Sequence, residues 1–343
     1  MNHLDFFGLR EDPFRLTPDR NFYFPTRGHT ALGEVIRYGL EEGEGFIIIT
    51  GEVGCGKTLL LRLMMDQIDD NRFETALILS PHLSPRELLF AILHDLGLPA
   101  AKHSKASLYT LLRLLNDHLS TLAQQGKKLL IVIDEAQNLP DKSLEQLRLL
   151  SNFETDTQKL LQIVLFGQPE LRTKLAQASL RQFVQRVSIM ENLTPLTKGE
   201  MSGYIRHRLK KSGGNEIPFS IFGAHLLWRH TRGYPRLINK VMSRALMVAC
   251  AAGKTTLSGR IIREAAASFN TPERFILPGG IKFRRSAVLI MVLLLLLAAA
   301  GIPDWLKSRD VTRITAAGTT PAGAATTSPE RTATAGFTLK NQP

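Results

Sequence analysis

The sequence predicts an α/β fold in which a parallel sheet is flanked by helices, followed by a small all-helical domain. Largely apolar runs of five to seven residues at 45–50, 75–79, 129–133 and 160–166 alternate with helical patterns along the first part of the 343-residue chain. Such runs are typical of strands buried on both faces of a parallel sheet. From Thr197 onward, helical patterns follow one another without a strand between them.

The remaining elements follow from periodicity and from helix start signals. Ser84 is a capping residue, Pro85 suits the first helical position and Glu87 the third, so a helix is expected from there to Leu96. A short fifth strand is expected at 187–190. The other expected helices cover 29–42, 59–68, 107–123, 180–185, 198–211, 220–230, 235–251 and 258–269.

A phosphate-binding loop follows the first strand. Its residues are Gly51, Glu52, Val53, Gly54, Cys55, Gly56, Lys57 and Thr58, with Leu59 opening the next helix. The glycines let backbone N–H groups close around phosphates, Lys57 reaches the β- and γ-phosphates, and the Thr58 hydroxyl ligates Mg²⁺. The pattern therefore predicts ATP binding with Mg²⁺. A second Gly-Lys-Thr at 253–255 fails the same criterion, because Val248 stands where the first glycine is needed.

Acidic and amide residues follow the later strands. Asp134 and Glu135 end the run 129–133, where Asp134 would hold Mg²⁺ through water and Glu135 would polarise the attacking water. Gln168 follows the fourth strand, either to touch the γ-phosphate or the lytic water or as part of a plain turn. Arg181 and Arg186 are each an arginine finger or a surface arginine, and the sequence leaves both readings open.

Arg236 occupies the first turn of the helix expected at 235–251. The positive end of the helix dipole disfavours a cation at that position unless an anion lies nearby. This local conflict favours a contact between Arg236 and phosphate.

The formal net charge of +12 is concentrated in one segment. Residues 197–270 hold thirteen Lys and Arg against three Asp and Glu, whereas 1–196 hold twenty-one against twenty-four. A basic face suits nucleic acid or anionic lipid, and it also suits a merely solvated surface. The two cysteines, Cys55 and Cys250, form no disulfide framework and fit a reducing cytoplasm; Cys55 is either a redox-sensitive residue or a small residue filling the loop.

A membrane anchor is expected near the end of the sequence. Residues 287–302 carry no charge and follow Lys282, Arg284 and Arg285, so we expect a basic linker at 271–285 and one transmembrane helix at 286–302. Thr, Ala, Gly and Pro dominate the tail 303–343, which is expected to be disordered and periplasmic. The first thirty residues lack the apolar stretch of a cleavable signal peptide.

Five motifs together resemble the general secretion pathway protein A (ExeA/GspA) family, which includes a related ATPase of mannose-sensitive pilus assembly. They are FFGLREDPF at 6–14, the phosphate-binding loop at 51–58, DEAQNL at 134–139, GQPEL at 167–171 and GYPR at 233–236. The resemblance covers about residues 4–270.

The resemblance implies an AAA+ P-loop ATPase of the bacterial inner membrane that helps an outer-membrane secretin assemble. By position, Gln168 matches the sensor 1 region, Arg236 matches sensor 2, and Arg186 best matches the finger of a homo-oligomeric ring. The implied divisions are an irregular segment 1–27 packed on the ATPase, an AAA+ domain 28–196 and a helical lid 197–270. Longer family members carry a peptidoglycan-binding domain, for which the residues after Ile302 are too few, so a partner subunit would supply it.

These observations lead to an expected function and to one alternative. The expected function is membrane-anchored ATP hydrolysis that supports assembly of a type II secretion or type IV pilus machine, with assembly proteins and anionic lipid as partners. The alternative is a DNA-binding AAA+ ATPase of the transposition-helper type. It rests on the basic excess at 197–270, and the apolar span at 287–302 argues against it.

Overall fold

The computed structural model describes residues 2–17, 19–79, 81–98, 106–154, 159–213 and 217–269. The linker, transmembrane helix and tail expected at 271–343 lie outside these ranges. Within the ranges, no helix is long and apolar enough to cross a membrane.

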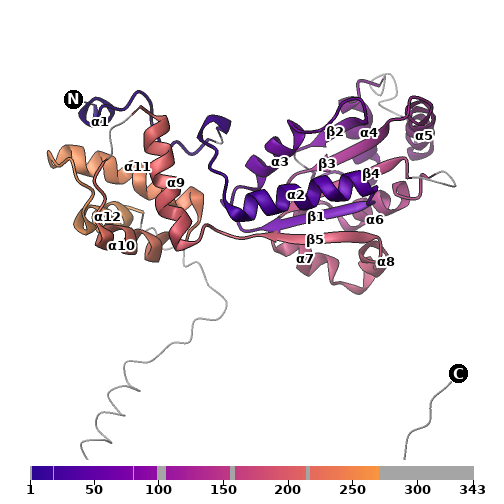
Figure 1. Cartoon of the computed structure of the whole chain (residues 1–343). Coiled ribbons are helices and arrows are strands. Elements are labelled where there is room, and N and C mark those ends of the chain that lie inside the picture. The colour runs from indigo at the N-terminus through magenta and orange to yellow at the C-terminus, as the bar shows by residue number, and fades with distance from the viewer. Residues whose placement is uncertain are drawn as a thin grey trace, which may run out of the picture. The chain divides into compact units, whose positions relative to one another are not determined.

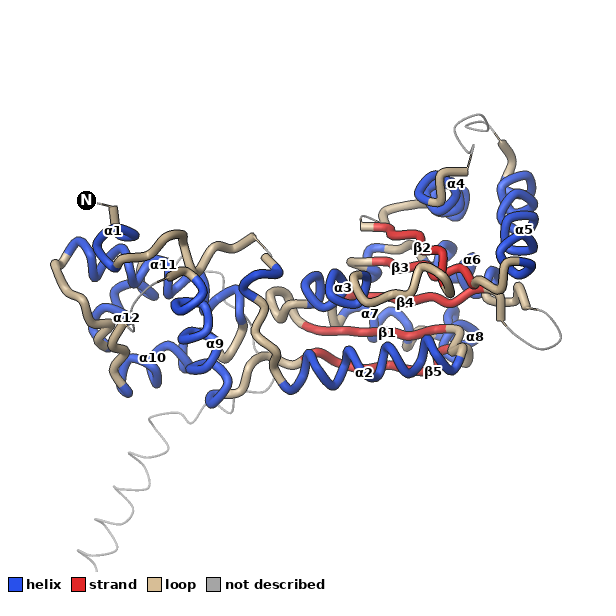
Figure 2. Tube along the Cα trace, turned by 45° about the horizontal axis from the view of Figure 1, so that its top comes forward, coloured by secondary structure: helices blue, strands red, loops and turns tan. Residues whose placement is uncertain are grey.

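Five parallel strands form one sheet in the order β2-β3-β4-β1-β5 (Figure 2). The strands are β1 (Phe46–Gly51), β2 (Phe73–Ile78), β3 (Lys128–Ile133), β4 (Leu161–Gly167) and β5 (Val187–Leu193). The three central strands β3, β4 and β1 are almost wholly buried, as their apolar runs require. The parallel α/β fold predicted from the sequence is confirmed.

Helices cover both faces of the sheet (Figure 1). On one face, Ile47 and Ile49 of β1 pack in a cluster with Leu32 and Ile36 of α2 (Arg27–Glu42) and with residues of α3 (Lys57–Met65). The alternate strand residues point into a second cluster on the other face. The helices of that face are α4 (Pro85–Asp95), α5 (Leu108–Gln124), α6 (Asp141–Leu150), α7 (Glu170–Leu175) and α8 (Arg181–Val184).

The expected start of α4 is confirmed at atomic detail. Ser84 accepts a hydrogen bond from the Glu87 backbone N–H, and the Glu87 carboxylate accepts one from the Ser84 N–H at 2.8 Å. Two N–H groups that the helix cannot satisfy internally are thereby paired. These contacts stabilise the first turn of α4.

Four further helices form a separate apolar cluster after the sheet. They are α9 (Lys198–Lys211), α10 (Ile221–Thr231), α11 (Pro235–Ala251) and α12 (Gly259–Ala267), and we refer to them as the helical bundle. Its core residues recur at helical spacing, as Met201, Ile205 and Leu209 do on α9.

The first residues of the chain belong to the segment 1–27 that was expected to be irregular and packed on the ATPase. Residues His3–Phe7 form a short helix, α1, and Phe7, Leu9 and Phe14 lie in the core of the helical bundle. Figure 1 shows α1 beside α11. The physical reason is that the aromatic side chains of this segment complete an apolar cluster that four short helices leave open on one side.

Arg208 of α9 joins this segment to the helical bundle from a buried position. Its guanidinium donates to the Pro13 carbonyl at 3.0 Å and lies over the rings of Phe22 and Tyr204. Burial lowers the pKa of Arg208, with the nearby Tyr204, Asp19 and Asp12 acting in the opposite direction. Burial of the guanidinium charge therefore has a desolvation cost, and the hydrogen bond to Pro13 and the contacts with the two aromatic rings offset it.

We expect Arg208→Ala to lower the free energy of unfolding by about 2–3 kcal/mol, since it leaves the Pro13 carbonyl unpaired and opens a cavity. Urea denaturation followed by circular dichroism measures the loss. Arg206→Ala, which removes an exposed arginine on the same helix, is the matched control and should change stability by less than about 0.5 kcal/mol. Equal losses in the two variants would contradict the anchoring role of Arg208.

Candidate nucleotide-hydrolysis site

Three chain segments meet at one edge of the sheet because the strands are parallel. The loop after β1 holds residues 51–58, the residues after β3 begin with Asp134, and Gly167 of β4 is followed by Gln168. Strand β4 lies between β1 and β3, so its carboxyl end lies between the other two. Open α/β sheets bind ligands at this edge.

The phosphate-binding loop has the backbone that its glycines predict. Gly54 and Gly56 adopt φ values of 84° and 105°, which residues with a Cβ atom rarely adopt. Gly56 is the N-cap of α3 and no side chain caps that helix, so its first N–H groups face the loop. The loop and the positive end of α3 together make a suitable site for phosphate.

Lys57 and Thr58 start α3 on the inside of this loop. Lys57 is only 6% exposed, and its Nζ donates to the carbonyl oxygens of Gly51 at 2.7 Å and Glu52 at 3.2 Å. The Thr58 hydroxyl donates to Asp134 Oδ2 at 3.0 Å. The structure thus brings together the lysine, the hydroxyl and the first acidic residue, as the sequence predicted.

Asp134 and Glu135 differ in their electrostatic environment. Burial raises the pKa of Asp134, although hydrogen bonds from Thr58 and from the Glu135 N–H act against it. Burial alone would also raise the pKa of Glu135, but hydrogen bonds from Gln168 and Gln137 and the charge of Lys57 bring it below its ordinary value. Glu135 is therefore ionised at neutral pH and can accept a hydrogen bond from water.

Two glutamine side chains hold the Glu135 carboxylate. Gln137 Nε2 donates to Glu135 Oε2 at 2.6 Å, and Gln168 Nε2 donates to the same oxygen at 3.0 Å. The Gln168 backbone N–H in turn donates to Gln137 Oε1 at 2.9 Å. Glu135 also adopts a left-handed backbone with φ 53°, a strained conformation that such contacts must stabilise.

Gln137 is a residue of this site to which sequence reasoning assigned no role. Its position two residues after Glu135 in the motif at 134–139 is the sequence feature that could have identified it. Lys174 Nζ fixes the same turn by donating to the carbonyl oxygens of Gln137 and Leu139 at 2.9 and 2.7 Å. The turn after β3 is thus rigidly held, and with it the carboxylate.

The oxygen donors at this edge fit Mg²⁺. The Thr58 hydroxyl and an Asp134 carboxylate oxygen lie 3.0 Å apart. Mg²⁺ prefers hard oxygen ligands, of which one or two come from protein side chains while phosphate and water complete the coordination shell. In the described residues, no group of three or more His, Cys, Asp or Glu could hold a metal by itself. Thr58 and Asp134 would therefore hold this ion together with the phosphates.

Arg236 lies against the phosphate-binding loop although it belongs to α11. Its backbone N–H donates to the Gly54 carbonyl at 3.3 Å, and a Cβ atom at Gly54 would lie 2.7 Å from Arg236 Cβ. The turn before α11 requires Gly233, where φ is 83° and a Cβ would lie 2.1 Å from the Leu196 carbonyl oxygen. The structure thus places Arg236 beside the phosphate-binding loop, and its contact with phosphate stays a prediction.

His29 of α2 is a second residue beside the loop that no sequence pattern singles out. Its Nδ1 lies 2.7 Å from Thr26 Oγ1, and a Cβ atom at Gly56 would lie 2.7 Å from its Nε2. Burial lowers the pKa of His29, while the charge of Glu200 and the Gly56 backbone act more weakly in the opposite direction. The folded protein therefore keeps this imidazole neutral at neutral pH.

The buried His29 makes stability depend on pH. The folded state holds its pKa below the ordinary value of 6.5, so the unfolded state takes up a proton first as the pH falls. The free energy of unfolding should decrease as the pH falls through about 6.5. We expect His29→Gln to reduce this decrease between pH 7.5 and 5.5 in urea denaturation, whereas His230→Gln, at an exposed position, should leave it unchanged. Identical pH dependence in wild type and His29→Gln would rule out this contribution.

The two arginine candidates lie away from the loop of their own chain. Arg186 precedes Val187, which pairs with Phe46 at the start of β1, the end of the strand opposite the loop. Its guanidinium donates to Asn152 Oδ1 at 2.6 Å. Arg181 is exposed at the start of α8. Either residue could reach a phosphate only in a neighbouring copy.

Cys55 is a small residue filling the loop. Its side chain is 1% exposed, and burial raises the pKa of the thiol to about 11. A thiol in this state is a poor nucleophile and a poor redox sensor. The alternative of a redox-sensitive cysteine has no support in this geometry.

Fold and site together are those of a P-loop nucleotide-binding protein, with a fold of the AAA type. Residues 40–175 match the family model described as AAA domain. General secretion pathway protein A of Aeromonas hydrophila is 42% identical over 251 residues, which is 73% of this chain and 45% of that protein. The similarity confirms the resemblance to the general secretion pathway protein A family that the motifs indicated, and the chain spans about half the length of this relative.

Solved structures support the fold. The ADP form of ORC2 from Aeropyrum pernix is 18% identical with a TM-score of 0.54, covering 84% of this chain and 80% of that one. Cdc6p from Pyrobaculum aerophilum is 18% identical with a TM-score of 0.56, covering 76% of this chain and 71% of that one. At such identity the likeness concerns the fold alone.

Proposed function

We propose that this protein hydrolyses ATP to ADP and phosphate at the carboxyl edge of its sheet. The observation that carries this proposal is the connected set of Thr58, Asp134, Glu135 and Gln168, in which each side chain is hydrogen-bonded to the next group. Lys57 binds the β- and γ-phosphates, and Glu135 orients and polarises the water that attacks in line. Thr58 and Asp134 would hold Mg²⁺, which would neutralise negative charge on the phosphates.

Gln168 and Arg236 have supporting roles in this proposal. Gln168 contacts the Glu135 carboxylate at 3.0 Å and can sense the γ-phosphate or the water from the same position. Arg236 contributes a cation from the helical bundle, which acts as the lid domain 197–270 over the AAA+ domain 28–196. Both residues give the electrostatic stabilisation that phosphoryl transfer requires.

The proposed arginine finger is Arg186 of a neighbouring copy in a head-to-tail ring, because its own loop lies at the other end of β1. ATPase activity should then rise faster than linearly with protein concentration. A mixture of Arg186→Ala and Lys57→Ala should regain activity at interfaces where an intact arginine faces an intact loop. Arg181→Ala in the same mixture distinguishes the two candidates. Activity proportional to concentration, with no rescue, would contradict the ring.

The proposed biological role is assembly of a type II secretion or type IV pilus machine, by support of secretin assembly from the inner membrane. The 42% identity to general secretion pathway protein A supports it. The proposal includes a single-pass anchor at 286–302, contact with anionic lipid, and an inner-membrane partner subunit that links the chain to the secretin. Co-purification from membranes in mild detergent tests it: a secretion or pilus subunit should be retained, and its absence would contradict this role.

A second candidate is the DNA-binding AAA+ ATPase of the transposition-helper type. The excess of ten positive charges in residues 197–270 favours it. DNA binding measured at physiological salt, with and without ATP, distinguishes the two roles. Tight binding stimulated by ATP, with secretion intact in cells lacking the protein, would replace the secretion role.

A further inference from the structure

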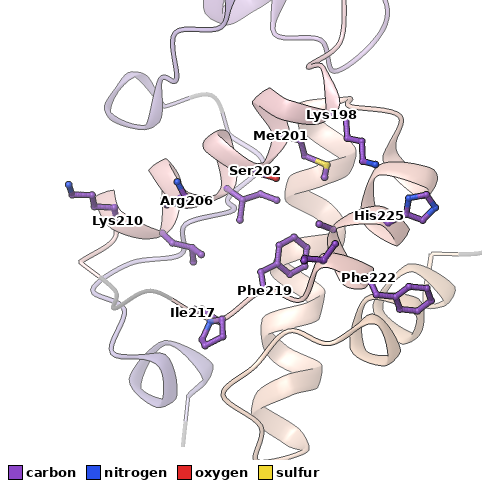
Figure 3. A pocket seen from close by; sticks show the side chains of 14 residues that line it. Lys198, Met201, Ser202, Arg206, Lys210, Ile217, Phe219, Phe222 and His225 are labelled. Carbon is purple, nitrogen blue, oxygen red and sulfur yellow. The ribbon is translucent and has the colours of Figure 1, made fainter.

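A groove of about 1270 Å³ lies between α9 and the segment that leads into α10 (Figure 3). Its apolar lining comes from Met201 and Ile205 of α9 and from Ile217 and Phe219 on the facing side. This groove belongs to the helical bundle and includes no residue of the nucleotide site. An inference about it therefore does not rest on the proposed ATP hydrolysis.

The mouth of the groove exposes large apolar side chains. Ile221 is 92% exposed and Phe222 is 59% exposed, and both stand in the first turn of α10. Figure 3 shows Phe222 and Phe219 on the same side of the groove. Exposed apolar side chains that gather beside an apolar hollow favour a role in binding another molecule.

Three cations and a serine form a row along the opposite rim. Lys198, Ser202, Arg206 and Lys210 follow one another at four-residue intervals on α9, and all four are exposed (Figure 3). Residues at this interval lie on one face of a helix, so the row is about 18 Å long. Among the described residues, no Asp or Glu lines the groove and none of the three cations forms an ion pair.

We propose that this groove binds an acidic amphipathic helix of a partner protein. The apolar face of that helix would cover Phe219, Ile221 and Phe222, and its carboxylates would face Lys198, Arg206 and Lys210. Helices that dock in apolar grooves use anchors at intervals of three and four residues, and the row on α9 has the matching interval. The unpaired cations favour an acidic helix and repel a basic one.

The charge of the rim also favours the acidic helix over residues 270–343 of the same chain as the occupant of the groove. Residues 270–343 contain nine Lys and Arg against four Asp and Glu, so the basic rim would repel them. A membrane would bury a protruding apolar surface more readily than the floor of a groove between two chain segments. The acidic helix is the occupant that satisfies both the apolar floor and the cationic rim.

Fluorescence anisotropy of the full-length protein with a labelled peptide tests this proposal. The probe is an 18-residue helical peptide with Glu at every fourth position and Leu on the adjoining face, and its matched control carries Lys in place of Glu. We expect the acidic peptide to bind at least about tenfold more tightly than the basic one. Arg206→Glu with Lys210→Glu, and separately Ile221→Ser, should each weaken acidic-peptide binding by about tenfold or more.

Lys211→Glu is the control variant, because Lys211 is an exposed cation of α9 that does not line the groove. It should bind the peptide as the wild type does. Equal affinity for both peptides, or equal loss in Lys211→Glu and the groove variants, would overturn the proposal. The proposal is also overturned if the acidic peptide fails to bind and Ile221→Ser abolishes binding of the protein to phosphatidylglycerol vesicles, because the groove would then bind lipid. If the acidic peptide fails to bind and Ile221→Ser abolishes self-association in sedimentation, the groove would instead bind a second copy of the chain.

Discussion

Lys57→Ala should weaken ATP binding by at least about 100-fold. The ammonium group lies buried among the carbonyl oxygens of its own loop, where it is fixed for contact with the β- and γ-phosphates. The alanine variant loses the charge-assisted hydrogen bonds expected between Lys57 and two phosphates. The negative charge of the phosphates then faces the backbone carbonyl oxygens of the loop with no cation to compensate it. Titration with a fluorescent ATP analogue measures the loss.

The chain provides a matched control for this variant. Lys254 stands in the second Gly-Lys-Thr, which follows the end of α11, and its backbone N–H donates to the Ala249 carbonyl at 2.9 Å. Lys254→Ala removes the lysine of this second Gly-Lys-Thr and leaves the phosphate-binding loop after β1 unchanged. It should leave ATP affinity unchanged, and a comparable loss in both variants would mean that the phosphate-binding loop has been wrongly located.

Glu135→Gln should preserve ATP binding and lower turnover by about 10²–10⁴-fold. An amide of the same shape keeps the volume and can still pair with Gln137 and Gln168, but it cannot accept a proton from water as a carboxylate does. Phosphate release under saturating ATP measures turnover, and the fluorescent analogue measures binding in the same preparation.

Glu34→Gln is the control for charge alone, because Glu34 is a solvent-exposed acid of α2 that pairs with Arg37. Its turnover should equal that of the wild type. Unchanged turnover in Glu135→Gln would remove this carboxylate from the mechanism. Loss of binding together with turnover would assign it to holding the nucleotide instead.

Much of the site was predictable because its chemistry is local in sequence. The loop at 51–58 lies between a buried strand and a helix, and parallel pairing then forces Asp134 and Gln168 to the same edge. The sequence also singled out Arg236 as a cation in the first turn of a helix, and the structure places its backbone against the loop at Gly54, while its contact with phosphate stays a prediction. Periodicity also gave α9 and α11 their observed limits.

Other features depend on contacts between distant segments. Strand β5 extends to Leu193, beyond the expected end at 190, because it is an edge strand and tolerates the exposed Glu191 and Asn192 that no apolar run reveals. The packing of Phe7 in the helical bundle and of His29 against Gly56 joins residues far apart in the chain. Sequence patterning carries no signal for such pairs.

Complementation of cells that lack the protein tests whether ATP hydrolysis at Glu135 is needed for assembly of the secretion or pilus machine. Wild-type protein and Glu135→Gln, expressed at equal levels, are compared by the amount of assembled outer-membrane secretin ring on denaturing gels without heating. We expect the wild type to restore the ring and Glu135→Gln to leave the subunits made but unassembled. Full assembly with Glu135→Gln would contradict the account.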